Sequence, residues 1–165
     1  APLREQRLGE RRVVLALAEV AALPQLVVQV IRRLRIALQL AHPGKPVAVI
    51  TGDGSLGFYL AEMDTAVRFK LPIVIIVGND AGWGLERELQ AATVAGSPNV
   101  ACELAPTRYD VIMKGFGGEG ETVEQLEDVA PAVKRAFAAG VPYCLNVKIR
   151  GVRSPFTDWQ IAGKK

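Results

Sequence analysis

The chain has 165 residues, of which half are hydrophobic and 22% are charged, and it contains two cysteines and one histidine. This length corresponds to one domain with enough apolar material for a core, and the composition excludes a disordered chain. Two cysteines are too few for a disulfide scaffold. They lack CxxC spacing and the chain has a single histidine, which argues against a zinc site with His and Cys ligands. Any chemistry is therefore expected to depend on a group that the chain binds.

The net charge of +3 is unevenly distributed, because residues 1–45 carry eight basic and three acidic side chains. The arginines there alternate with apolar residues, as on a solvated helix face, and no aromatic residue precedes Phe58. Nucleic-acid binding is therefore not expected. Glu19 interrupts the apolar run near the start, which is too short for a membrane span of about 20 residues. We expect a soluble cytoplasmic protein without membrane contact.

Predicted helices and strands alternate along the chain. Helices are indicated where apolar residues recur at three- and four-residue steps, over 25–41, 58–70, 108–115 and 123–139. Strands are indicated by uninterrupted apolar runs at 47–51, 72–77 and 141–149, with a short fourth strand at 120–123 and a long loop over 79–107. This order predicts an α/β fold with a doubly wound, mostly parallel sheet and helices on both faces.

Two loops that follow predicted strands carry the residues best suited to ligand binding. They are Gly52-Asp53-Gly54-Ser55-Leu56-Gly57 and Gly78-Asn79-Asp80-Ala81-Gly82-Trp83-Gly84. The first has the G-x-G-x-x-G pattern of a dinucleotide-binding turn, and Asp80 lies 23 residues past Gly57, near the place of a ribose-binding acid. A nicotinamide-dependent oxidoreductase is therefore one hypothesis.

Asp53 argues for a different ligand. In a dinucleotide-binding turn its carboxylate would face the diphosphate at close range, like charge against like charge. A divalent cation between the carboxylate and the diphosphate turns this repulsion into attraction. Mg²⁺ prefers oxygen ligands from one or two carboxylates plus phosphates. Asp80 offers the second acidic ligand, Gly82 a backbone carbonyl, and Ser55 a hydroxyl for the phosphate oxygens. The two loops therefore favour a magnesium-diphosphate site.

The same residues resemble the thiamine-diphosphate signature. Gly52-Asp53-Gly54-Ser55 is followed, 24 residues counted from Ser55 to Gly78, by Asn79-Asp80, which is similar to the family's GDG, spacer and closing Asn-Asn or Asn-Asp. The surrounding sequence resembles the C-terminal cofactor-binding domain of the acetolactate synthase family, which includes benzoylformate decarboxylase and 2-hydroxyacyl-CoA enzymes. Further similarity lies in LAPTRYD, in residues 115–137 and in VPYCLNVKI.

The resemblance implies roles for individual residues. Asp53 and Asp80 would bind Mg²⁺ through side-chain oxygens, with Asp80 in place of the family's second Asn, and Gly82 would bind it through its carbonyl. The cofactor-binding residues implied for thiamine diphosphate are Gly52, Gly54, Ser55, Gly82 and Trp83. For Trp83, simple packing of the loop is an equal alternative.

The likeness covers residues 34–165, whereas residues 1–33 form a predicted helical segment that does not match the family's glycine-rich segment. Full-length members carry two further domains, one of which supplies the glutamate that activates the cofactor across a subunit interface. No catalytic residue is assigned in this chain. We therefore expect part of an oligomeric 2-oxo-acid decarboxylase or carboligase, taking a 2-oxo acid or acyl-CoA substrate and needing a pyrimidine-binding domain or subunit. A catalytically silent, truncated remnant is the alternative.

Overall fold

The computed structural model describes residues 26–27, 39–40, 42–94, 96 and 99–152. Five strands in these ranges form one sheet in the order β1-β2-β3-β5-β4, and every neighbouring pair is parallel. The strands are β1 (Leu26–Val27), β2 (Val47–Gly52), β3 (Ile73–Asn79), β4 (Glu119–Val123) and β5 (Tyr143–Lys148). The predicted α/β class is confirmed, and the described sheet is wholly parallel.

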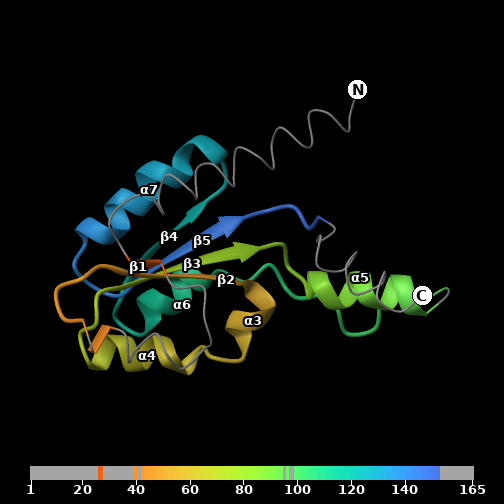
Figure 1. Cartoon of the computed structure of the whole chain (residues 1–165), viewed down its shortest axis with the longest axis horizontal. Coiled ribbons are helices and arrows are strands. Elements are labelled where there is room, and N and C mark those ends of the chain that lie inside the picture. The colour runs from red at the N-terminus through yellow and green to blue at the C-terminus, as the bar shows by residue number, and fades with distance from the viewer. Residues whose placement is uncertain (1–25, 28–38, 41, 95, 97–98, 153–165) are drawn as a thin grey trace.

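The helices cover both faces of the sheet, as predicted (Figure 1). They are α3 (Asp53–Gly57), α4 (Ala61–Arg68), α5 (Gly84–Thr93), α6 (Tyr109–Gly115) and α7 (Leu126–Ala138). The chain moves in one direction across the sheet from β2 to β3 to β4 and reverses only between β4 and β5. Right-handed crossovers therefore place α4 and α6 on one face and α7 on the other. No helix in the described ranges is long and apolar enough to cross a membrane.

Successive side chains of each central strand pack into hydrophobic cores on opposite faces of the sheet, as expected for a sheet buried on both faces. On the α4 and α6 face, Met63 and Met113 pack against a row of strand residues that includes Val49 and Ile75. On the α7 face the core residues are Ala48, Val74, Ile76, Val123, Val129, Ala132, Val133, Ala136, Tyr143 and Leu145. These two cores hold the strand ends in fixed positions.

Three of the predicted boundaries are wrong. A helix was expected from residue 25, but Leu26–Val27 is a strand paired with β2; periodicity alone does not separate a short buried strand from a helix. The predicted helix over 58–70 is shorter, and α3 precedes it, beginning directly at Asp53. The predicted loop over 79–107 contains α5, a helix in which no residue is buried. Most of residues 1–33 lie outside the described ranges.

A buried carboxylate joins α6 to β4. Asp110 is fully buried, and its oxygens accept bonds from Arg108 at 2.9 and 2.7 Å and from the Thr122 hydroxyl at 3.0 Å. The hydrogen bonds from Arg108 are the main cause that holds the pKa of Asp110 below its ordinary value of 3.8, against the opposing effect of burial. The ionised form is therefore the one that stabilises the fold.

We predict that Asp110→Asn lowers the free energy of unfolding at pH 7 by about 1–3 kcal/mol, because the amide cannot accept all the bonds that the buried carboxylate accepts from Arg108 and Thr122. A carboxyl with a lowered pKa stabilises the fold above its unfolded-state pKa. The difference between variant and wild type should therefore shrink as the pH falls below 3.8. Urea unfolding at several pH values measures it. Asp64→Asn, which breaks an exposed Arg–Asp pair, should change stability by less than about 1 kcal/mol. An equal effect of the two variants would contradict the prediction.

Candidate functional site

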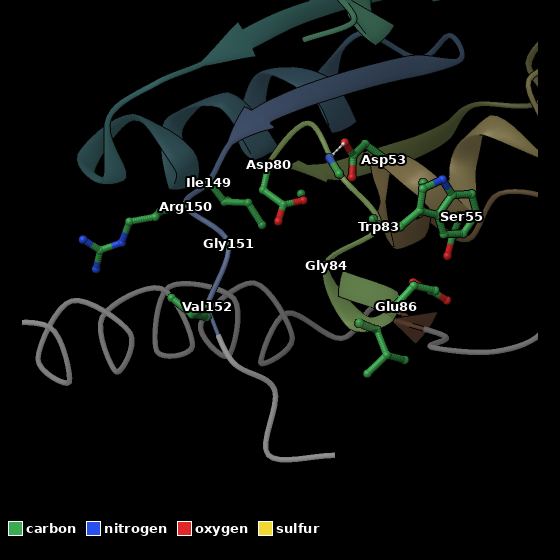
Figure 2. A pocket seen from close by; sticks show the side chains of 15 residues that line it. Asp53, Ser55, Asp80, Trp83, Gly84, Glu86, Ile149, Arg150, Gly151 and Val152 are labelled. Carbon is green, nitrogen blue, oxygen red and sulfur yellow. Dashed lines mark hydrogen bonds between the residues drawn. The ribbon is translucent and has the colours of Figure 1, made fainter. Parts of the chain in front are cut away.

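Strands β2 and β3 bring the two glycine-containing loops to the same edge of the sheet. Their register places Gly52 beside Gly78, so Asp53 and Asp80 follow neighbouring strand ends. All of the predicted site residues line one cavity of about 270 Å³, namely Gly52, Asp53, Gly54, Ser55, Asp80, Gly82 and Trp83 (Figure 2). The structure thus brings together the seven residues that the sequence predicts for metal and cofactor binding.

Asp53 is the buried acidic group of this cavity. Only 1% of the residue is exposed, and its Oδ2 accepts a hydrogen bond of 3.1 Å from the Gly82 amide (Figure 2). The Tyr109 hydroxyl, on α6, donates to the Asp53 backbone carbonyl at 3.3 Å. Burial is the main cause that raises the pKa of Asp53 above its ordinary value; the Gly54 and Gly82 amides lower it, and nearby Asp80 raises it. A cation beside this carboxylate would relieve both unfavourable effects.

Gly82 has a backbone that is free to face Asp53. It forms an antiparallel bridge with Glu103, in which the amide–carbonyl bonds run from Trp83 to Cys102 at 2.7 Å and from Leu104 to Ala81 at 2.8 Å. In such a pair the central residue uses neither its own N–H nor its own C=O for the bridge. Since both groups of one extended residue point to the same side and the N–H binds Asp53, the Gly82 carbonyl faces the Asp53 side as well.

Trp83 both lines the cavity and packs the loop, so the two alternatives raised by the sequence are compatible. A Cβ at Gly54 would lie 2.9 Å from the Trp83 ring, so no larger residue fits there. The Trp83 and Phe58 rings also pack, with centroids 5.0 Å apart. The indole therefore packs the loop after β3 against the segment after β2.

Part of the cavity lining comes from residues that the two predicted loops do not contain. Residues 149–152, which follow β5, border the cavity together with Gly78 and the first turn of α5. The Ile149 amide donates to the Asn79 carbonyl at 3.0 Å and so continues the pairing of β5 with β3. A Cβ at Gly151 would lie 2.6 Å from the Asp80 carboxylate, so glycine lets the chain pass close to Asp80. The signal available in the sequence was that β5 also ends at this edge.

The acidic side chains at the cavity are too few to form a complete metal site. Within the described ranges, no three His, Cys, Asp or Glu residues gather to hold an ion. A cation at Asp53 and Asp80 must therefore complete its coordination with backbone, phosphate and water oxygens. This donor set fits Mg²⁺ on a diphosphate and does not fit structural zinc.

Comparison with known families agrees with this geometry. Residues 34–147 match the family described as "Thiamine pyrophosphate enzyme, C-terminal TPP binding domain". The chain belongs to this family. Both cavity loops lie within the match, which confirms the resemblance found in the sequence. The match gives no support to a nicotinamide-binding turn at residues 52–57.

Relatives of this thiamine-pyrophosphate-binding domain include synthases and lyases. It is 42% identical over 113 residues to "Probable acetolactate synthase" of Mycobacterium bovis, covering 68% of this chain and 20% of the relative. It is 41% identical over 120 residues to "2-hydroxyacyl-CoA lyase 2" of Danio rerio, covering 69% and 19%. The chain thus spans about a fifth of the length of these relatives.

A solved structure gives the same result. The domain is similar to the thiamine diphosphate-dependent 4-hydroxybenzoylformate decarboxylase of Rhodococcus jostii RHA1, with a TM-score of 0.64 and 27% identity. The similarity covers 73% of this chain and 22% of that one. It supports the fold and the family together.

We predict that Asp53→Asn raises the free energy of unfolding of the metal-free protein at pH 7 by about 0.5–2 kcal/mol, the range of typical stabilising substitutions. The amide keeps one oxygen to accept from Gly82 and gives up the bond from the Gly54 amide, but it also removes a charge whose burial is the largest effect on this group. Urea unfolding without divalent ions measures the change. Asp128→Asn, at an exposed position, should give no gain. A loss of stability in Asp53→Asn would show that the buried charge is already well compensated.

Proposed function

We propose that this domain binds the diphosphate of thiamine diphosphate through Mg²⁺ held by Asp53, Asp80 and the Gly82 carbonyl. The observation that carries the proposal is the convergence of two carboxylates and an unused carbonyl at one cavity. Arg150 is the single basic residue among those lining this cavity, and its side chain points away from both aspartates (Figure 2). The Arg87 guanidinium lies against Gly82 and Gly151 but is paired with Glu103. A cation between the two carboxylates and the diphosphate would therefore favour binding at this site.

The glycines and Ser55 complete the proposed cradle. Gly54 and Ser55 lie in the first turn of α3, beside the buried Asp53. Their backbone and hydroxyl groups would contact the diphosphate oxygens, with Gly52 and Trp83 bordering them. When bound, thiamine diphosphate supplies carbanion stabilisation next to a carbonyl carbon. The residues of this chain would bind and orient the diphosphate end of the cofactor.

For the whole protein we propose a 2-oxo-acid decarboxylase or carboligase, or a 2-hydroxyacyl-CoA lyase, that acts as an oligomer with a pyrimidine-binding domain or subunit. The names of the relatives, which are synthases and lyases, support this class. Residues 34–165 would form the cofactor domain, with 1–33 as a separate segment. Two buried free cysteines support a reducing, cytoplasmic location.

Calorimetric titration of the chain with thiamine diphosphate tests the proposal. Binding should require Mg²⁺ and should be abolished in Asp53→Ala, because this substitution removes a ligand that no neighbouring group replaces. Asp64→Ala, on the outer face of α4, is the matched control and should bind like wild type.

The other hypotheses give different results in the same titration. Tight NADH binding without metal would contradict the proposal and restore the oxidoreductase hypothesis. A folded chain that binds neither ligand would also contradict it and would favour a silent remnant. Binding by the chain without turnover, followed by turnover when a pyrimidine-binding subunit is added, would support the need for a partner.

A second prediction concerns Asp80, which stands where the resemblance implies an amide. Asp80→Asn should retain Mg²⁺-dependent binding, because an amide oxygen also ligates Mg²⁺. Residual binding in the presence of EDTA should rise about fivefold, since like charges 4 Å apart in water repel by about 1 kcal/mol. Calorimetry in EDTA measures this change, with Glu62→Gln on exposed α4 as the control. An unchanged residual affinity would show that Asp80 does not face the diphosphate.

A further inference from the structure

A series of side-chain hydrogen bonds connects the β4 edge of the sheet to the turn that carries Asp80. It begins at Asp110 on α6, whose Oδ1 accepts from the Thr122 hydroxyl on β4 at 3.0 Å. Thr122 accepts from the Asn146 amide on β5 at 3.1 Å, and Asn146 accepts from the Asn79 amide on β3 at 2.9 Å. The series thus crosses three neighbouring strands in the order β4-β5-β3.

Groups that only accept fix the bond directions at both ends of this series: the Asp110 carboxylate at one end and the Thr107 carbonyl, which accepts from Asn79, at the other. An ionised carboxylate only accepts, so the Thr122 hydroxyl must donate to it and keeps its lone pairs for Asn146. The Asn146 NH₂ group must then donate to Thr122, which leaves its oxygen to accept from Asn79. The two donors of Asn79 go to Asn146 and to the Thr107 carbonyl, both at 2.9 Å. The Asn79 oxygen is therefore turned toward the loop.

That oxygen accepts a hydrogen bond of 3.1 Å from the amide of Ala81. Ala81 has a φ of 55°, a left-handed conformation that is unfavourable for a residue with a side chain. It lies between Asp80 and Gly82, the two ligands proposed in this loop. Without a partner that holds the turn, Ala81 would favour a different backbone conformation and would move both groups.

We propose that Asn79, Asn146 and Thr122 are positioning residues for the Mg²⁺ site, because they hold the Ala81 turn in the conformation that presents Asp80 and the Gly82 carbonyl. This inference rests on the proposed function for the identity of the ion. Asn146 is 1% exposed and Asn79 is 7% exposed, so water does not replace their bonds. Thr122 is the member whose hydroxyl can be removed with little change of shape, and it does not line the cavity.

Thr122→Val in the full chain tests the inference. The variant leaves the Asn146 NH₂ without its acceptor, so Asn146 no longer holds the Asn79 amide in a fixed place. The Mg²⁺ concentration for half-maximal binding of thiamine diphosphate should rise about tenfold, the lower end of the range for groups behind metal ligands. At saturating Mg²⁺ the affinity for the cofactor should return to the wild-type value. Thr122→Ser, which restores the hydroxyl, should restore the Mg²⁺ requirement.

Amide hydrogen exchange, followed by NMR without ligands, tests the turn directly. The Ala81 amide should be protected in the wild type and should lose protection in Thr122→Val, while core amides of β2 keep theirs. Thr65→Val, which removes a hydroxyl bonded to the Ala61 carbonyl on α4, is the matched control and should change neither readout.

The outcomes separate this inference from the proposed function. If the wild type binds thiamine diphosphate with Mg²⁺ but Thr122→Val has an unchanged Mg²⁺ requirement, the positioning role is overturned and the proposed function stands. If the wild type does not bind, the proposed function fails, and loss of Ala81 protection still supports control of the turn. Should Thr122→Val fail to fold, an unprotected Ala81 amide in the wild type would overturn the inference, and a protected one would support it.

Discussion

The parallel pairing of β2 with β3 is the constraint on which the site depends. The two strands stay in register from Val47 beside Ile73 to Gly52 beside Gly78. The loops that follow them therefore begin side by side at the same edge of the sheet. Asp53 and Asp80 then face a common space, although they are far apart in sequence. Because the two cores hold these strands from both faces, the sheet fixes the points from which the two loops start.

The cavity gathers groups that are individually unfavourable in the free protein. Asp53 is a buried carboxylate whose pKa is raised mainly by burial, and Asp80 adds a like charge. Ala81 holds a left-handed backbone next to them. Such features persist only where neighbouring groups hold them in place. Here the hydrogen bond between Asn79 and Asn146, the contact of Trp83 with Gly54 and the bond from Tyr109 to Asp53 do so. A bound cation would compensate the charges, so we interpret the strain as preparation for a ligand.

The sequence predicted the central strands and seven of the fifteen residues that line the cavity, because short-range signals encode them. Apolar runs mark strands buried on both faces, and a parallel sheet places their carboxyl ends together. It did not predict α5, whose residues lack a buried face, or the lining by residues 149–152, which depends on β5 lying beside β3. The role of Thr122 was also out of reach, since nothing local in β4 indicates that its hydroxyl meets Asn146 across the sheet.

The orientation of the asparagines illustrates why long-range order matters for a site of this kind. An asparagine amide can present either its oxygen or its nitrogen to a neighbour with almost no change of shape. At Asn79 the Thr107 carbonyl, which only accepts, and the Ala81 amide, which only donates, select the orientation. Asp110 plays the same part for Thr122 and Asn146, and the bonds from Arg108 keep it ionised. The charge of Asp110 at the β4 edge of the sheet therefore orients Thr122 and Asn146, and Asn146 in turn supports Asn79, which holds the Ala81 turn.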